Sequence, residues 1–326
     1  MSAQSLPTFF LAGVPKSGST SLYRYLDQHP DIYMSPIKEP NFFADEARFA
    51  NFSAYFQKLG EPARARLRAF LSGPMTTACS AGPVEGWDGY LSLFKNVRHE
   101  KAIGEASVCY LWSPTAAKNI AARVPQAKFV IILRNPAERA FSQYKHMLSF
   151  ALDRVDFRAH VQASMAASAT TFSELYPFLN FGFYGEQLER LFQTVERARV
   201  GIWFYEDFCR DPARMLREVC QFLNVDDQFV PDVSKRHMEP RIPRGRLLQR
   251  IRQNSVWRAA RQFVPANAKA ALRAAAFEPA GNLHLSPRDR TMLVDYYRED
   301  LRKLSRLLDR DFSSWMDTAV AAQPGL

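Results

Sequence analysis

The chain has 326 residues, of which 47% are hydrophobic and 23% charged, values of a globular protein that can bury a large core. No stretch approaches the ~18 consecutive apolar residues of a membrane span, and the start lacks the basic region and apolar run of a signal peptide. We therefore expect a cytoplasmic protein without a transmembrane segment. The formal net charge of +10 favours anionic partners: nucleotides, acidic glycans, nucleic acids or membrane surfaces.

The distribution of cysteines and cations bears on two kinds of partner, a metal ion and a nucleic acid. The four cysteines show no spacing typical of a metal site, so we predict no metal and expect the thiols to be reduced. Between Arg236 and Arg273, ten cations are opposed only by Glu239. Because no nucleic-acid-binding module accompanies them, we expect no nucleic-acid partner.

The first strand and helix of the chain enclose a loop suited to a phosphate group. The apolar residues 8–14 predict a buried strand, and helical spacing resumes after Ser19. At such a junction the first helical N–H groups lack backbone partners and the helix dipole favours an anion, to which Lys16 adds a full charge. The alternative is an ordinary strand-turn-helix junction capped by Ser or Thr.

The position of the lysine distinguishes this loop from that of a nucleoside triphosphatase. In G-x-x-x-x-G-K-[ST] the lysine directly follows the second glycine. Here Ser19 follows Gly18, and the lysine lies upstream at position 16. The loop therefore predicts nucleotide binding without triphosphate hydrolysis.

Strands and helices alternate along the rest of the chain. Residues 127–133 and 200–204 predict two further strands, and the helices after them begin near Pro136 and Pro212. A last long helix begins after Ser286 and is expected to cover the sheet. Residues 43–101 and 151–185 give no firm assignment, and residues 231–243 predict a surface loop. The pattern predicts an α/β, P-loop-like three-layer fold, with a central, mainly parallel sheet flanked by helices.

A second anion site is predicted at the end of the strand 127–133. Ligands of such sheets lie at the carboxyl ends of the strands, where Arg134 follows directly and Ser142 lies about two helical turns on. Two separated anion sites suit a nucleotide with two phosphate groups. The alternatives are an ion pair of Arg134 with Glu138, and a helical serine without a function at 142.

Three segments carry a resemblance to a known family: residues 15–22, 38–43 (Lys-Glu-Pro-Asn-Phe-Phe) and 131–142. Together they look like a sulfotransferase that uses 3′-phosphoadenosine 5′-phosphosulfate (PAPS), most similar to the bacterial branch akin to heparan sulfate sulfotransferases. Residues 104–107 with Tyr110, residues 205–208 and the closing stretch 297–315 agree, so the resemblance spans nearly the whole chain. It implies one sulfotransferase domain, with a nucleotide-binding core at about 6–225 and a basic loop and C-terminal helices at about 231–316.

The resemblance also assigns residues to the donor nucleotide. It implies that Arg134 and Ser142 bind the 3′-phosphate. A basic loop late in the chain would close over the nucleotide, and we assign this role to Arg244, with Arg241 and Arg246 as alternatives. The 5′-phosphosulfate would be held by Lys16, Ser17, Gly18, Ser19, Thr20 and Ser21.

Sulfuryl transfer needs a base for the acceptor and a cation for the leaving phosphate. The resemblance places the base at Glu39. Lys16 would stabilise the leaving group, and Lys38 would assist or pair with Glu39. Without the resemblance, Lys38 and Glu39 would be an exposed charged pair. Glu105 and Ser107 are predicted to line the acceptor pocket.

Two departures from related enzymes bear on the acceptor. Relatives that act on glycosaminoglycans often carry a lysine where this chain has Ala106. Sulfotransferases of small phenols use a histidine base, but His99 and His146 lie outside any matching motif.

Glu206 is interpreted as a structural cap or ion-pair residue.

The sequence thus predicts transfer of a sulfuryl group from PAPS to a hydroxyl of a carbohydrate or glycolipid, by in-line displacement and without a metal. Two alternatives stay open: a nucleotide kinase-like user of ATP, and a non-enzymatic basic protein that binds polyanions. The identity of the acceptor and the oligomeric state do not follow from the sequence.

Overall fold

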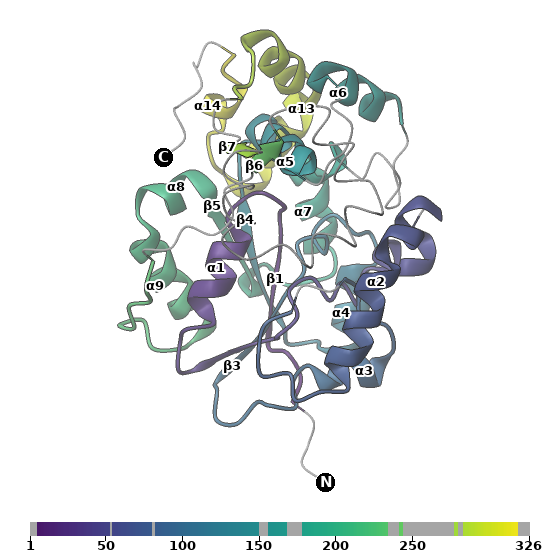
Figure 1. The fold of residues 1–326 in the computed structure, drawn as a ribbon. Coiled ribbons are helices and arrows are strands. Elements are labelled where there is room, and N and C mark those ends of the chain that lie inside the picture. The colour runs from purple at the N-terminus through teal and green to yellow at the C-terminus, as the bar shows by residue number, and fades with distance from the viewer. Residues whose placement is uncertain are drawn as a thin grey trace.

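A central sheet of five parallel strands forms the middle layer of the protein (Figure 1). The computed structural model describes residues 5–52, 54–79, 82–149, 156–167, 178–233, 241–243, 277–279 and 283–318. The strand order is β2-β3-β1-β4-β5. The strands are β1 (Phe9–Gly13), β2 (Ile32–Met34), β3 (Ala102–Ala106), β4 (Lys128–Leu133) and β5 (Val200–Phe204).

The alternation of side chains along β1 explains the two helical layers. Phe9 and Leu11 pack in one apolar cluster, whereas Phe10 and Ala12 belong to another on the opposite face. The first cluster is covered by α1 (Ser19–Leu26), α8 (Tyr205–Arg210) and α9 (Pro212–Leu223). The second is covered by α4 (Ala116–Arg123) and α7 (Tyr184–Phe192). The predicted three-layer α/β fold is confirmed.

Helices also form in the two intervals that the sequence left unassigned. The first contains α2 (Ala54–Leu71), α3 (Trp87–Ser92) and the short turns η1 (Asp45–Ala47) and η2 (Phe49–Asn51). The second contains α6 (Phe157–Ala166) and the turn η3 (Asn180–Gly182). A last short turn, η4 (Arg197–Arg199), leads into β5.

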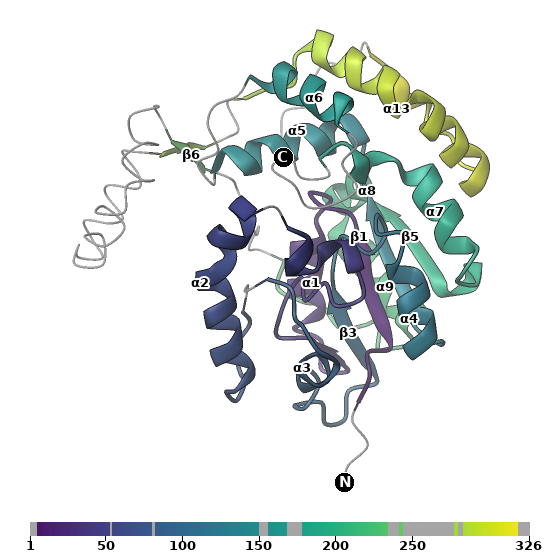
Figure 2. The same cartoon turned by 90° about the vertical axis from the view of Figure 1, so that its right-hand side faces the viewer.

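The long C-terminal helix lies one layer further out than expected. α13 (Pro287–Leu308) begins after Ser286, whose Oγ accepts the N–H of Asp289 at 3.1 Å, as the capping pattern predicts. It packs on α7 and on α5 (Pro136–Ser149), as Figure 2 shows. The short helix α14 (Ser313–Met316) lies beside α13 (Figure 1). The Asp300 carboxylate accepts the N–H groups of Gly185 and Glu186 at the start of α7, so α13 is fixed to α7. The expectation that this helix covers the sheet is wrong to that extent.

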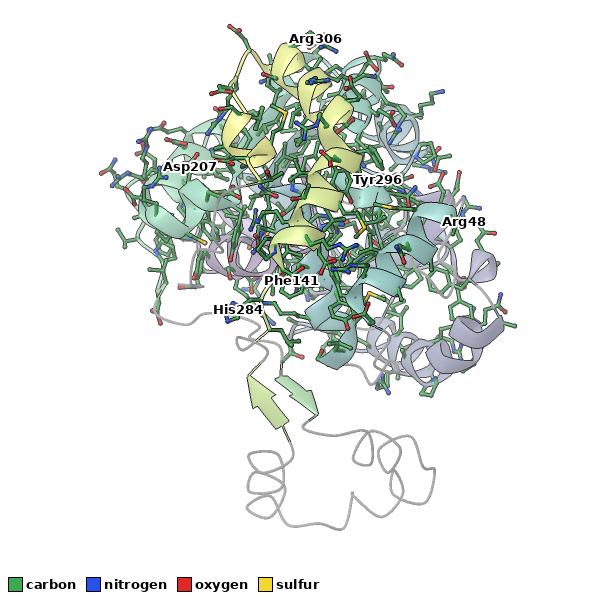
Figure 3. All side chains as sticks on the ribbon, turned by 90° about the horizontal axis from the view of Figure 1, so that it is seen from above. Arg48, Phe141, Asp207, His284, Tyr296 and Arg306 are labelled. Carbon is green, nitrogen blue, oxygen red and sulfur yellow. The ribbon has the colours of Figure 1, made fainter. Side chains whose placement is uncertain are left out.

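A two-stranded antiparallel hairpin extends from the body of the protein next to α5. It pairs β6 (Arg241–Pro243) with β7 (Phe277–Pro279). Figure 3 shows the hairpin projecting on the side where Phe141 and His284 are labelled. The predicted loop at 231–243 therefore ends in a strand. Among the described residues, no helix is long and apolar enough to cross a membrane.

Candidate active site

The carboxyl ends of the parallel strands gather the predicted site residues at one edge of the sheet. β1 leads into the loop with Lys16, and β4 leads directly into Arg134. Glu39 follows β2, and its N–H donates to the carbonyl of Ala106, the last residue of β3, at 2.8 Å. Segments far apart in the sequence thus meet where ligands of open α/β sheets bind.

The loop after β1 has the backbone of an anion site. Gly18 caps α1 with φ 86°, a left-handed conformation that favours glycine. The Leu22 N–H donates to the Gly18 carbonyl at 3.0 Å, which begins the backbone bonding of α1. The N–H groups of Ser19, Thr20 and Ser21 therefore stand at the open end of the helix. The helix dipole adds partial positive charge at the same place.

Ser17 supplies a test of whether an anion fits this loop. Its side chain is fully buried, and its Oγ has no hydrogen-bond partner among the described residues. A buried hydroxyl without a partner is costly, and an anion held by the loop would give it one. Ser17 therefore fits the predicted role in holding the 5′-phosphosulfate.

Arg134 joins the second predicted anion site to the first. Its Nη1 donates to the main-chain oxygen of Lys16 at 2.9 Å, and its guanidinium lies 4.4 Å from the centre of the Tyr205 ring. The alternative ion pair of Arg134 with Glu138 is wrong, because Glu138 is paired with Arg290. Within the described residues the Arg134 guanidinium makes no further hydrogen bond, so its remaining N–H groups can bind an anion beside the loop.

The cations near the loop repel one another. Burial, and then the charge of Arg134, lower the pKa of Lys16 to about 8. The ammonium groups of Lys38 and Lys145 add to this effect. Burial lowers the pKa of His146 to about 4, with Lys16 contributing, so this ring is neutral at pH 7. A bound anion would relieve this repulsion.

Lys145 lies near the anion loop and was not singled out from the sequence, whereas its neighbour His146 was considered there as a histidine outside any matching motif. Both lie on α5, three and four positions after the predicted Ser142, which is half-buried. Residues at these spacings share one face of a helix, so the signal was present in the sequence. His99 precedes β3 and is exposed at the opposite edge of the sheet.

The predicted base Glu39 lies in a turn next to Lys38. Lys38 and Glu39 form an ion pair, and both side chains are partly exposed. The other carboxylate oxygen, Glu39 Oε2, accepts the N–H of Val108 at 3.0 Å. The charge of Lys38 also contributes to the lowered pKa of Lys16. The assignments of Glu39, Lys16 and Lys38 as catalytic stay predictions.

Glu105 and Ser107 have hydrogen bonds within the protein. Both side chains are fully buried, and Ser107 Oγ donates to Glu105 Oε1. Tyr90 and Tyr110 donate to Glu105 Oε2 at 3.0 and 2.9 Å. These contacts do not test the prediction that the pair binds an acceptor.

The late basic loop lies mostly outside the described residues, and Arg244 and Arg246 are among the positions left out. Only the backbone of Arg241 is described, in β6, which packs against α5. Glu206 has the structural contact expected of it, since its Oε1 accepts the N–H of Asn135 at 3.0 Å, just before α5.

Comparison with known proteins identifies the family. The model of the sulfotransferase family matches residues 7–229. The chain is 26% identical over 233 residues to the bifunctional heparan sulfate N-deacetylase/N-sulfotransferase 1 of Caenorhabditis briggsae, covering 69% of this chain and 23% of the relative. It is 28% identical over 226 residues to the human enzyme 3 of the same name, covering 68% of this chain and 22% of the relative. It therefore spans less than a quarter of the length of these relatives.

A solved structure matches the chain over nearly its full length. The crystal structure of a sulfotransferase from Alicyclobacillus acidocaldarius superposes with a TM-score of 0.70 at 28% identity, covering 96% of this chain and 100% of that one. The resemblance carried by the three sequence segments is thereby confirmed. The chain belongs to the sulfotransferase family.

Proposed function

We propose that this protein transfers a sulfuryl group from PAPS to a hydroxyl group of a carbohydrate or glycolipid. The observation that carries the proposal is the hydrogen bond of Arg134 to the Lys16 carbonyl, which joins the two predicted anion sites at the edge of the sheet where the Glu39 turn also lies. A 3′-phosphate and a 5′-phosphosulfate are two anions separated by a ribose. The names of the heparan sulfate relatives support a glycan acceptor.

In this reaction, Glu39 acts as the base, Lys16 stabilises the leaving group, and other residues bind the nucleotide. PAPS supplies a sulfuryl group on a good leaving phosphate. The Glu39 carboxylate takes the acceptor proton as the acceptor oxygen bonds to sulfur, and the bond from sulfur to the phosphate oxygen breaks. Lys16, which is protonated below its pKa of about 8, neutralises the charge that develops on that phosphate oxygen. Ser17, Arg134 and Ser142 hold the two ends of the nucleotide.

The same relatives suggest an acceptor nitrogen as a second candidate, because their names include N-sulfotransferase. Two polysaccharides separate the candidates. N-acetylheparosan offers hydroxyl groups, whereas de-N-acetylated heparosan also offers amines. Transfer of radiolabel to the acetylated polymer supports the hydroxyl acceptor; transfer only to the deacetylated polymer supports the amine.

The role of Glu39 is tested by the isosteric variant Glu39→Gln. We expect transfer to fall by about 10²- to 10⁴-fold, the usual contribution of a general base. The affinity for adenosine 3′,5′-bisphosphate, measured by calorimetry, should change by less than about twofold, because the amide leaves the cations in place. Glu61→Gln, an exposed change on α2, is the matched control. Unchanged turnover of Glu39→Gln would remove Glu39 from the mechanism.

The remaining alternatives differ in their ligand. A kinase-like enzyme would prefer ATP with magnesium over adenosine 3′,5′-bisphosphate, and such a preference would overturn the proposal. A polyanion-binding protein would bind heparosan and lose this binding steeply with salt, whether or not Lys16 is replaced.

A further inference from the structure

The turn that carries Glu39 is held in an unusual backbone conformation. Glu39 and Asn41 have φ angles of 67° and 50°, in the left-handed region that disfavours residues with a side chain. Such conformations persist only where surrounding contacts fix them.

The end of β3 and the residues after it provide these contacts. Ala106 accepts the Glu39 N–H, and the Val108 N–H binds the Glu39 carboxylate, as described above. Ser107 Oγ accepts the Asn41 N–H at 2.9 Å. The Cys109 thiol donates to Asn41 Oδ1 at 3.1 Å. The four successive residues 106–109 thus hold the turn that carries Glu39.

Ser107 has a particular place among them. Its hydroxyl has one proton, which it gives to Glu105 Oε1. Its lone pairs are then free to accept the Asn41 N–H. Glu105 therefore determines which way the hydroxyl acts, and without this acceptor the hydroxyl could rotate and donate elsewhere.

Burial of the Glu105 carboxyl costs free energy. The carboxyl is fully buried, and burial raises its pKa to about 7, with the charge of Glu39 adding to the rise. It has no ion pair among the described residues, and its partners are the three hydroxyl groups of Tyr90, Ser107 and Tyr110. A buried carboxyl is a weak contributor to stability, which favours a task beyond packing.

We infer that Glu105 is a positioning residue for sulfuryl transfer: it orients Ser107, and Ser107 with Val108 holds Glu39 toward the anion loop. This inference rests on the proposed function, in which Glu39 is the base. It assigns Glu105 and Ser107 a role behind the base, where the sequence had predicted acceptor contacts.

The kinetic test removes either Ser107 or Glu105 from the chain of hydrogen bonds that leads to the Glu39 turn. Ser107→Ala removes the link to Asn41, and Glu105→Leu removes the acceptor for Ser107. We expect kcat for transfer from PAPS to the heparosan substrates to fall by about 10- to 100-fold, as misplacement of a reacting group does. The KM for PAPS should stay within about twofold, because the donor loop is untouched.

Tyr90→Phe is the matched control. It removes a hydrogen bond to Glu105 Oε2 without touching Ser107, so kcat should stay at the wild-type value although the stability falls. Glu105→Gln and Ser107→Thr keep the hydrogen-bonding atoms between 105, 107 and the turn, and should restore most of kcat. If Glu105→Leu fails to fold, the comparison of kcat between Ser107→Ala and Tyr90→Phe tests the inference instead.

Hydrogen exchange provides a readout that does not need activity. In Ser107→Ala, the backbone amides of Glu39, Asn41, Phe42 and Phe43 should exchange faster than in Tyr90→Phe or wild type. Equal exchange and equal kcat in Ser107→Ala and Tyr90→Phe would overturn the inference. If the wild type prefers ATP with magnesium over adenosine 3′,5′-bisphosphate while the exchange contrast is present, the proposed function fails and the positioning of the turn stands.

Discussion

The Arg134 guanidinium donates a hydrogen bond of 2.9 Å to the main-chain oxygen of Lys16, 118 residues earlier in the chain. The arginine proposed to bind the 3′-phosphate therefore also shapes the loop proposed to bind the 5′-phosphosulfate. The Tyr205 ring lies against the same guanidinium. Because a single side chain contacts both places, the two proposed anion sites would form one unit. Changes at Arg134 should then affect the two sites unequally.

Replacement of Arg134 by Lys tests this relationship. Lysine keeps the charge but lacks the planar fork that can serve a carbonyl and an anion at once. We expect the affinity for adenosine 3′,5′-bisphosphate to fall by about 10- to 100-fold, the range for hydrogen bonds to charged groups. The affinity for AMP, which has no 3′-phosphate, should fall less. Calorimetric titration of both nucleotides measures the difference.

Arg210→Lys is the control, since Arg210 is an exposed residue of α8 paired with Asp207. It should leave both affinities unchanged. An equal loss for the two nucleotides in Arg134→Lys would show that Arg134 only shapes the loop and does not bind the 3′-phosphate.

Gly18 allows the loop to approach α8. A Cβ added there would lie 3.0 Å from the Phe208 ring and 3.2 Å from the Tyr205 ring, at a φ of +86°. Gly18→Ala should therefore lower the free energy of unfolding by about 1–3 kcal/mol through strain and crowding. It should also weaken binding of adenosine 3′,5′-bisphosphate by about tenfold or more, because the displaced loop carries the anion contacts.

Gly82→Ala separates the two causes. Gly82 has a similar φ of +92°, but an added Cβ would meet nothing within 4 Å. Denaturant unfolding should show a smaller loss for this variant, and its nucleotide affinity should equal that of the wild type. If Gly18→Ala binds the nucleotide as well as Gly82→Ala does, the contact with α8 has no part in shaping the site.

Local signals in the sequence were sufficient for three of the five strands of the sheet and for the anion loop, whereas β2 and β3 were not among the predicted strands. The apolar run of β1 and the helical spacing after Ser19 are short-range patterns that the structure follows closely. The strand before Arg134 likewise needs no tertiary information. The position of Lys16 before Gly18 separated this loop from that of a triphosphatase without any coordinates.

What the sequence did not give depends on packing between distant segments. Glu105 lies in a strand whose five residues are all buried, and a glutamate by itself does not reveal that three hydroxyl groups surround it. Tyr205 meets Arg134 only because β4 and β5 are neighbours. The place of α13 outside α7 follows from the Asp300 contacts, which no periodicity encodes.

The low pKa of Lys16 makes donor binding depend on pH. Burial and neighbouring cations lower this pKa to about 8, so the ammonium loses its proton as the pH rises through 8 in the free protein. An anion binds the protonated form and raises the pKa again, so affinity is highest below pH 8 and falls above it. Between pH 7.5 and 9.5 we expect affinity for adenosine 3′,5′-bisphosphate to fall roughly tenfold to thirtyfold by this linkage.

Lys16→Arg isolates the contribution of this lysine, because a guanidinium stays charged throughout that pH range. Calorimetric titrations of the variant should show a nearly flat pH profile, whatever its absolute affinity. Lys145→Met, which removes another cation near the loop, should keep most of the decline, since Lys16 still titrates. A decline of equal steepness in Lys16→Arg and wild type would mean that a different group controls the affinity, and Lys16 would then not be the cation that meets the donor.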